Sequence, residues 1–188
     1  SPAMCRIDDD MANKTVKTYR TKYHEIPTYW RTMDNVIGAL SMRQSMKVGV
    51  LQVDGPSQTI ILPNGMPLFY ENMRKETTKG FDGKTKNQWV FDYGRETKYT
   101  FGGKMTENVV QACARIITMN AATRIRRITN ESPLAGQIHD QLVYVVRQEV
   151  ARDHLNVVLA EMKRGLDWFH DLPLDAEGEM GPNLLEAK

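Results

Sequence analysis

The chain has 188 residues and a mass of 21.5 kDa, which is enough for one domain or for part of a larger one. Hydrophobic residues make up 41% of the chain and charged residues 26%, so general intrinsic disorder is excluded. No apolar run approaches the roughly 18 residues that a membrane-spanning helix needs, so the sequence predicts no membrane partner.

The charges are distributed unevenly along the chain. The net charge is only +2, but residues 1–127 carry 20 Lys and Arg against 12 Asp and Glu, whereas residues 128–188 carry 5 against 11. A basic body with an acidic end predicts a surface on the first two thirds that faces a polyanion. A solvated surface with uneven charges is the alternative, and charge alone leaves both open.

Cysteine usage favours a reducing compartment. Cys5 and Cys113 are the only cysteines, too few for a disulfide framework or for a four-thiolate zinc site. The first residues show no basic region followed by an apolar stretch, so we expect no signal peptide. The prediction is therefore a cytoplasmic location.

Two helices are predicted at the start of the chain. The first covers residues 9–23 and follows acidic residues that suit a helix N-terminus. The second covers residues 26–44, with Pro27 in its first turn. Its apolar stripe, at helical spacing, predicts core packing and consists of Tyr29, Trp30, Met33, Val36, Ile37 and Leu40.

Short strands are predicted between residues 47 and 100. Asp54-Gly55 and Asn64-Gly65 are strong turn signals. Residues 80–87 are rich in Lys and Gly and predict an exposed loop tip, and a further hairpin is expected around Gly94. Together these segments predict a twisted antiparallel element that carries several cations.

The rest of the chain is predicted to be two helices separated by one hairpin. A long helix covers residues 104–127, two short strands with a tight turn cover 134–146, and an amphipathic helix covers 149–164. An acidic, irregular tail follows, with Trp168 and Phe169 as its anchors. The buried side of the long helix is expected to comprise Val109, Val110, Ala112, Cys113, Ile116, Ile117 and Ala121. The predicted fold class is mixed α/β (α+β), with an antiparallel sheet and packed helices.

His139-Asp140, between two apolar strands, is the sharpest local feature for chemistry. Phosphoryl transfer by two metal ions needs carboxylates on rigid elements, with the ions about 3.5–4 Å apart. A hairpin tip supplies that rigidity and lets a polymer substrate approach. Asp is also a favoured turn residue without any further role, so both interpretations stand on this pair alone.

The start of the long helix carries a second candidate. Gly102-Gly103-Lys104 could hold a phosphate at the helix N-terminus, although its spacing is not that of a P-loop. A row of polar side chains follows at spacings of four, three and four and shares one helix face, which suits phosphate and groove-edge contacts with a duplex. A solvated helix face is the alternative. The row consists of Lys104, Asn108, Gln111 and Arg115.

Other chemistries find little support in the sequence. The four histidines are not at zinc-ligand spacing, and no Ser lies in a Gly-x-Ser-x-Gly elbow. Cys113 is expected on the buried side of its helix, which disfavours a thiol nucleophile. A purely structural or adaptor role stays open.

These two features, in this order and about 30 residues apart, resemble the C-terminal part of a family A DNA polymerase, the bacterial polymerase I class. The phage-type branch is the most similar. Residues 101–115 resemble its Gly-Gly-Lys-x-Thr-Glu-Asn-x-x-Gln helix, and His139-Asp140 resembles the third catalytic motif, usually His-Asp-Glu. Residues 19–30, 62–70 and 172–182 resemble the helix leaving the fingers, the hairpin after it and the end of those enzymes. The resemblance thus spans nearly the whole chain.

The resemblance implies a role for each matching residue. Asp140 would be one of two aspartates that bind both Mg²⁺ ions, and His139 would contact the primer-terminal backbone. The helix bearing the row from Lys104 to Arg115 would lie along the minor groove of the primer–template DNA. Gln141 stands where the family usually has Glu; an amide keeps hydrogen bonding but loses the charge, so we expect it to contact nucleic acid and put a metal role there in doubt.

The resemblance also implies an architecture. Residues 1–46 would be rear fingers helices, 47–100 the β-hairpin region that joins fingers and palm, and 101–188 the palm with its duplex-contacting helix, the catalytic hairpin 134–146, and a C-terminal helix and tail. The chain would thus hold a partial polymerase domain, in which an antiparallel palm sheet packs with helices.

Two motifs of the family are not found in the sequence. These are the first catalytic motif, an Asp followed by Tyr-Ser-x-x-Glu, and the fingers helix with the nucleotide-binding Lys. We therefore expect the isolated chain to be inactive and to need a complementing polymerase chain or a missing N-terminal part. The completed enzyme would use Mg²⁺, primer–template DNA and deoxynucleoside triphosphates. An exposed apolar patch is expected where the missing palm strands would pair.

A non-catalytic DNA-binding or assembly subunit that kept the polymerase-derived fold is the alternative. It shares the duplex-binding surface but makes no use of Asp140 in chemistry, so the sequence leaves it open.

Overall fold

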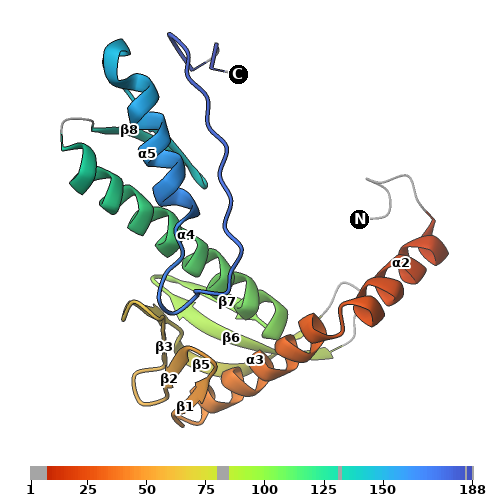
Figure 1. The fold of residues 1–188 in the computed structure, drawn as a ribbon. Helices are drawn as coiled ribbons and strands as arrows, with labels where there is room; N and C mark the ends of the chain where they lie inside the picture. Colours follow the sequence, from red (N-terminus) through yellow and green to blue (C-terminus); the bar gives the residue numbers. More distant parts are fainter. Residues whose placement is uncertain (1–7, 80–84, 131–132, 185, 188) are drawn as a thin grey trace. The chain divides into compact units, whose positions relative to one another are not determined.

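Figure 1 shows the chain in a computed structural model, which describes residues 8–79, 85–130, 133–184 and 186–187. The chain divides into two compact units, Ser1–Val109 and Val110–Lys188. The boundary falls within one long helix, α4. The predicted fold class, mixed α/β with antiparallel sheets and packed helices, is confirmed.

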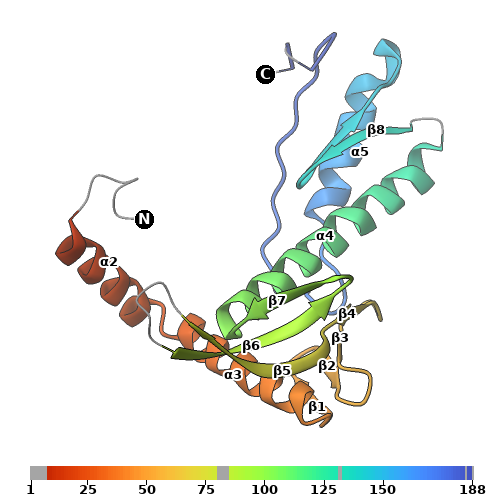
Figure 2. The same cartoon turned by 180° about the vertical axis from the view of Figure 1, so that it is seen from behind.

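Two helices begin the first unit. The helix α2 (Asp9–Lys22) starts at Asp8, whose side chain accepts a hydrogen bond from the Met11 amide at 2.6 Å. It has acidic residues in its first turn and basic residues in its last, which complement the helix dipole. It buries none of its side chains, and Figures 1 and 2 show no other described element beside it.

The helix α3 (Glu25–Ser41) provides the main apolar face of the first unit. Met33, Val36, Ile37 and Leu40 are buried as predicted. Tyr29 and Trp30, which were predicted in the same stripe, are only partly buried. The helix packs on the strands that follow it, so its stripe closes the core of this unit.

The first sheet has four antiparallel strands in the order β1-β2-β3-β4. The strands are β1 (Met46–Val48), β2 (Leu51–Asp54), β3 (Thr59–Ile61) and β4 (Pro67–Phe69). The predicted turn residues lie where β2 ends and between the next strands: Asp54 closes β2 and Gly55 follows it, and Asn64-Gly65 lies between β3 and β4. Gly65 has a positive φ of 85°, whereas a Cβ at Gly55 would overlap the backbone of Arg43 and Gln44.

The second sheet has three antiparallel strands, β5-β6-β7, and is seen most openly in Figure 2. The strands are β5 (Glu71–Lys79), β6 (Thr85–Tyr93) and β7 (Glu96–Thr100). Gly94 lies in the β6–β7 turn with a φ of 62°, so the expected hairpin is confirmed. The predicted loop tip was too long, since residues 85–87 begin β6; residues 80–84 lie outside the described residues.

The long helix α4 (Gly102–Thr129) extends the predicted 104–127 at both ends. Its buried residues form two sets, and with about 100° of rotation per residue they lie on different sides of the helix. Val110 points away from the first set, which is the side buried at that end of the helix, and is 57% exposed, so the prediction of its burial was wrong. Val109, Cys113, Ile116 and Ala121 are buried as predicted. The first set is Met105, Val109, Cys113 and Ile116; the second is Thr118, Ala121, Ala122 and Ile125.

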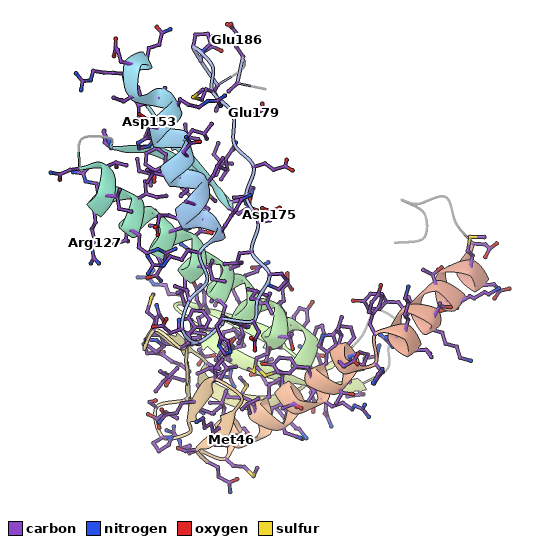
Figure 3. All side chains as sticks on the ribbon, viewed as in Figure 1. Met46, Arg127, Asp153, Asp175, Glu179 and Glu186 are labelled. Atoms are coloured by element: carbon purple, nitrogen blue, oxygen red, sulfur yellow. The ribbon has the colours of Figure 1, made fainter. Side chains whose placement is uncertain are left out.

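The second unit contains a two-stranded hairpin, a helix and an extended tail. The hairpin pairs β8 (Leu134–Ile138) with β9 (Gln141–Tyr144), and the helix is α5 (Ala151–Lys163), preceded by the short 3₁₀ turn η1 (Gln148–Val150). The tail has neither helix nor strand among its described residues, as predicted. Asp175 and Glu179 lie along it (Figure 3), and Lys163 of α5 holds Asp175 at 2.7 Å.

None of the described helices combines the length and the apolar character that crossing a bilayer requires.

Candidate functional site

The β8–β9 hairpin places His139 and Asp140 at its tip. Ile138 pairs with Gln141, so the turn between the strands consists of His139 and Asp140 alone. Two-residue hairpin turns require a positive φ at the first central position, and His139 has a φ of 53°. A side chain in this backbone region costs free energy that glycine would avoid, and such residues cluster at functional sites.

The Asp140 carboxylate is exposed and has no hydrogen-bond or ion-pair partner within the described ranges. The turn itself is held from one side, because the Gln137 side-chain amide donates to the His139 carbonyl oxygen at 3.0 Å. His139 and Gln141 are also exposed. The hairpin tip therefore exposes three adjacent polar side chains, and one of them, Asp140, is an unpaired carboxylate.

The hairpin tip offers only part of the ligand set that a metal ion needs. Among the residues that the structure describes, no group of three or more His, Cys, Asp or Glu side chains is placed to hold an ion. Mg²⁺ takes octahedral oxygen ligands and usually binds one or two carboxylates together with water and substrate phosphates. Asp140 fits as one such ligand, and the remaining ligands must come from outside this part of the chain.

An aromatic pair fixes the hairpin on α5. The rings of Tyr144 on β9 and His154 on α5 meet edge to face, with their centroids 4.8 Å apart. Burial raises the pKa of the Tyr144 hydroxyl and lowers the pKa of His154, because both charged forms lose solvation. Tyr144 Oη and His154 Nε2 are both buried without a hydrogen-bond partner among the described residues. Sequence reasoning missed this pair, because the two residues belong to different elements and no local spacing relates them.

The other side of the hairpin is left uncovered. Ile138, which the register puts on the face opposite Tyr144, is exposed, and so is Val145; the described strands of this sheet number only two, so each has an outer edge without a pairing partner. Exposed apolar side chains beside an open strand edge are typical of a surface that another strand covers.

The start of α4 is closed by a carboxylate of the protein itself. The Gly102 amide donates to Asp34 Oδ1 of α3 at 2.6 Å. A Cβ at Gly102 would overlap the carbonyl oxygen of Trp30 and lie 2.9 Å from Asp34 Cγ, so only glycine fits at this approach of α4 to α3. Asp34 thus occupies the first amide at this helix N-terminus, which disfavours the hypothesis of a phosphate there. Sequence reasoning missed this contact because Asp34 lies far from Gly102 in the chain.

The predicted polar row on α4 is partly engaged within the protein. Lys104 Nζ lies 4.2 Å from the centroid of the Tyr99 ring, and Asn108 Nδ2 donates to Tyr70 Oη at 3.3 Å. Gln111 and Arg115 are exposed, whereas Lys104 and Asn108 are half-buried. The helix repeat keeps all four on one face, and Asn108 also serves the packing of buried Tyr70. The polar row belongs to α4, and the His139-Asp140 turn belongs to the β8–β9 hairpin, so they are two separate candidate surfaces.

Cys113 is not a candidate nucleophile. It is buried on α4, and desolvation raises the pKa of its thiol, which disfavours the reactive thiolate. The prediction that this cysteine lies on the buried side is confirmed.

Comparison with known proteins finds the chain similar to a DNA polymerase of Bacillus phage SP02, with 29% identity over 183 residues. The similarity covers 87% of this chain but 26% of the phage polymerase, so the chain spans about a quarter of the length of that relative. No family model matches the chain, and no solved structure does. The chain is thus similar to part of a phage DNA polymerase, which supports a relationship to the nucleotidyltransferases.

Proposed function

We propose that this chain provides the C-terminal, palm and rear-fingers part of a family A DNA polymerase of the phage-type branch. The observation that carries the proposal is the exposed, unpartnered Asp140 carboxylate at a two-residue hairpin tip, in a chain most of which is similar to a phage DNA polymerase. The reaction is template-directed nucleotidyl transfer to the 3′ end of a primer, in DNA replication.

In this proposal the β8–β9 hairpin tip takes part in the chemistry, and one face of α4 binds the DNA duplex. Asp140 would hold Mg²⁺, and His139 would contact the backbone of the primer terminus. Bound Mg²⁺ supplies neutralisation of the charge that develops on the transferring phosphates. Lys104, Asn108, Gln111 and Arg115 would bind the duplex along their shared face of α4, and Gln141 would contribute a neutral hydrogen-bonding group beside the carboxylate.

Asp140 alone cannot make the two-metal site. Two ions about 3.5–4 Å apart need carboxylates from more than one element. We therefore propose that the second aspartate comes from a complementing polymerase chain or from a preceding part of the protein, and that the chain by itself does not extend a primer.

Primer extension tests the proposal. The full chain is assayed with Mg²⁺, primer–template and deoxynucleoside triphosphates, alone and mixed with the polypeptide encoded immediately upstream. Extension is expected only in the mixture, and Asp140→Asn is expected to reduce it to background. Asp167→Asn is the matched control, because Asp167 is also exposed and has no partner among the described residues; it should leave the rate unchanged.

Two results would contradict the proposal. Extension by the mixture at an unchanged rate with Asp140→Asn would remove Asp140 from the chemistry. Duplex binding without extension in any mixture would favour the non-catalytic subunit. Binding itself is measured by the salt dependence of duplex affinity, where Arg115→Gln should lower the log–log slope by about 1.

A further inference from the structure

A contact between two aromatic side chains fastens the β8–β9 hairpin to α5. Figure 2 shows the hairpin lying across this helix, and the rings of Tyr144 and His154 meet there with their centroids 4.8 Å apart. Tyr144 is the last residue of β9, and Asp140 directly precedes the same strand. The contact therefore fixes the strand that leads to the exposed carboxylate.

The surroundings of His154 suit a neutral imidazole. The residue is 7% exposed, and its Nε2 is buried without a hydrogen-bond partner among the described residues, as is Tyr144 Oη. A protonated imidazole carries N–H groups on both nitrogens and a positive charge, and a buried charge without an acceptor or water is costly. Protonation of His154 therefore opposes its place against Tyr144.

No charged neighbour in the described part of the chain offsets this cost. Burial is the cause that lowers the pKa of His154, and burial also keeps Tyr144, the titratable residue of the two strands, neutral by raising its pKa. The largely buried Glu161 carboxylate of α5 is held by Arg124 of α4, and Asp175 of the tail is held by Lys163. The other charged side chains on the elements around His154 are exposed: Arg126, Arg127, Arg147, Glu149, Arg152 and Asp153.

We propose that the contact between Tyr144 and His154 is a pH-sensitive latch, which holds the β8–β9 hairpin on α5 while His154 is neutral and releases it when His154 is protonated. In the open form the imidazole is solvated, so the open form binds the proton more tightly than the closed form. The closed form is then favoured above about pH 6.5, the ordinary pKa of histidine, and is lost as the pH falls below it. Release would also move Asp140; this consequence rests on the proposed function, whereas the latch itself does not.

Hydrogen–deuterium exchange of the full chain, followed by mass spectrometry and corrected for the intrinsic exchange rate, measures the opening. One proton separates the two forms, so protection of residues 134–144 should fall by up to about tenfold between about pH 7.5 and about pH 5.5. Protection of β5 and β6 in the first unit should stay unchanged, because the latch does not involve them.

Three variants assign the effect to the latch. His154→Phe keeps an aromatic ring but cannot titrate, so its hairpin should stay protected at both pH values. Tyr144→Phe keeps the ring contact and should keep the pH dependence, since the hydroxyl has no partner among the described residues. His170→Gln is the matched control, because His170 belongs to the same unit but its side chain is 76% exposed; it should leave the loss of protection as it is in the native chain.

The latch is overturned if the native hairpin keeps its protection at low pH, or if His154→Phe loses protection to the same extent. It is also overturned if β5 and β6 lose protection together with the hairpin, since the chain then unfolds as a whole, or if His170→Gln removes the effect. Primer extension separates the inference from the proposed function. If the latch is found but Asp140→Asn extends primers at the native rate, the proposed function fails and the latch stands; if Asp140→Asn stops extension but protection does not depend on pH, the reverse holds.

Discussion

Replacement of Gly102 by alanine tests whether α4 is seated as closely on α3 as the structure indicates. The added Cβ would overlap the Trp30 carbonyl oxygen, which is backbone and cannot rotate away. The helix must then move outward, which also lengthens the 2.6 Å hydrogen bond from the Gly102 amide to Asp34. Gly102→Ala therefore perturbs both the packing of the helix start and its capping.

The expected loss of stability follows from three contributions. Overpacking against backbone costs about 3 kcal/mol, at the upper end of its usual range. Weakening of the bond to Asp34 costs about 1 kcal/mol, because that side chain is exposed to solvent. The higher helix propensity of alanine offsets about 1 kcal/mol. The net prediction is a loss of about 3 kcal/mol in the free energy of unfolding, which is large against the typical 5–15 kcal/mol of a domain.

Urea unfolding followed by tryptophan fluorescence and circular dichroism measures this loss. Gly38→Ala is the control: Gly38 lies inside α3 and a Cβ there has nothing within 4 Å, so the same substitution should stabilise the protein by about 0.5–1 kcal/mol. The reasoning is refuted if Gly102→Ala stays within about 0.5 kcal/mol of the native chain, or if Gly38→Ala is equally destabilising.

Two further predictions concern the second unit. Arg124 Nε donates to Glu161 Oε2 at 2.5 Å, and the two side chains are only 19% and 13% exposed. Arg124→Met removes this partner from the largely buried Glu161 carboxylate, so it should lower the free energy of unfolding by about 2–3 kcal/mol, measured by urea unfolding. Lys163→Met, which breaks the exposed pair with Asp175, should cost less than about 1 kcal/mol, and equal losses would contradict this. The lowered pKa of His154 means that the unfolded chain takes up its proton first, so stability should fall as the pH drops through about 6.5. His154→Phe should flatten that part of the urea-midpoint profile, and an unchanged profile would assign the effect to other groups.

The local elements were predictable where one face is apolar. The stripe on α3 was predicted from its spacing, and Met33, Val36, Ile37 and Leu40 are all buried. The turns at Asp54-Gly55 and Asn64-Gly65 were predicted because their residue types favour tight turns. The His139-Asp140 turn was also predicted, since two apolar strands flank it.

The strand β5 had no clear pattern in the sequence. Its residues Glu71–Lys79 are polar on both faces apart from one apolar residue, Met73, which is buried. Charged partners take the place of apolar contacts: Arg74 pairs with Glu76 within the strand and with Asp92 across the sheet at 2.9 Å. A period-two hydrophobic signal cannot detect a strand of this kind.

Contacts between distant segments could not be predicted either. Asp34 and Gly102, and Tyr144 and His154, come together only after the helices have packed, and no local spacing encodes them. Val110 was misplaced for a related reason: the buried side of α4 changes along the helix, so a single stripe drawn through its apolar residues does not describe it. The roles of the candidate site residues stay predictions, because they depend on ligands that sequence and fold do not supply.

The helix α2 has a consequence for how this protein can be studied. It is capped and its charges suit its dipole, yet it buries no side chain, and its contact with α3 is the stacking of Arg20 over the Trp30 ring at 5.9 Å. A helix of this length with so little tertiary packing is marginal in water, and its amide hydrogens should exchange with solvent nearly as fast as those of a free peptide. Any surface that covers Val16, Tyr19 and Tyr23 would slow this exchange, and the protection factor would then report directly the free energy of that contact.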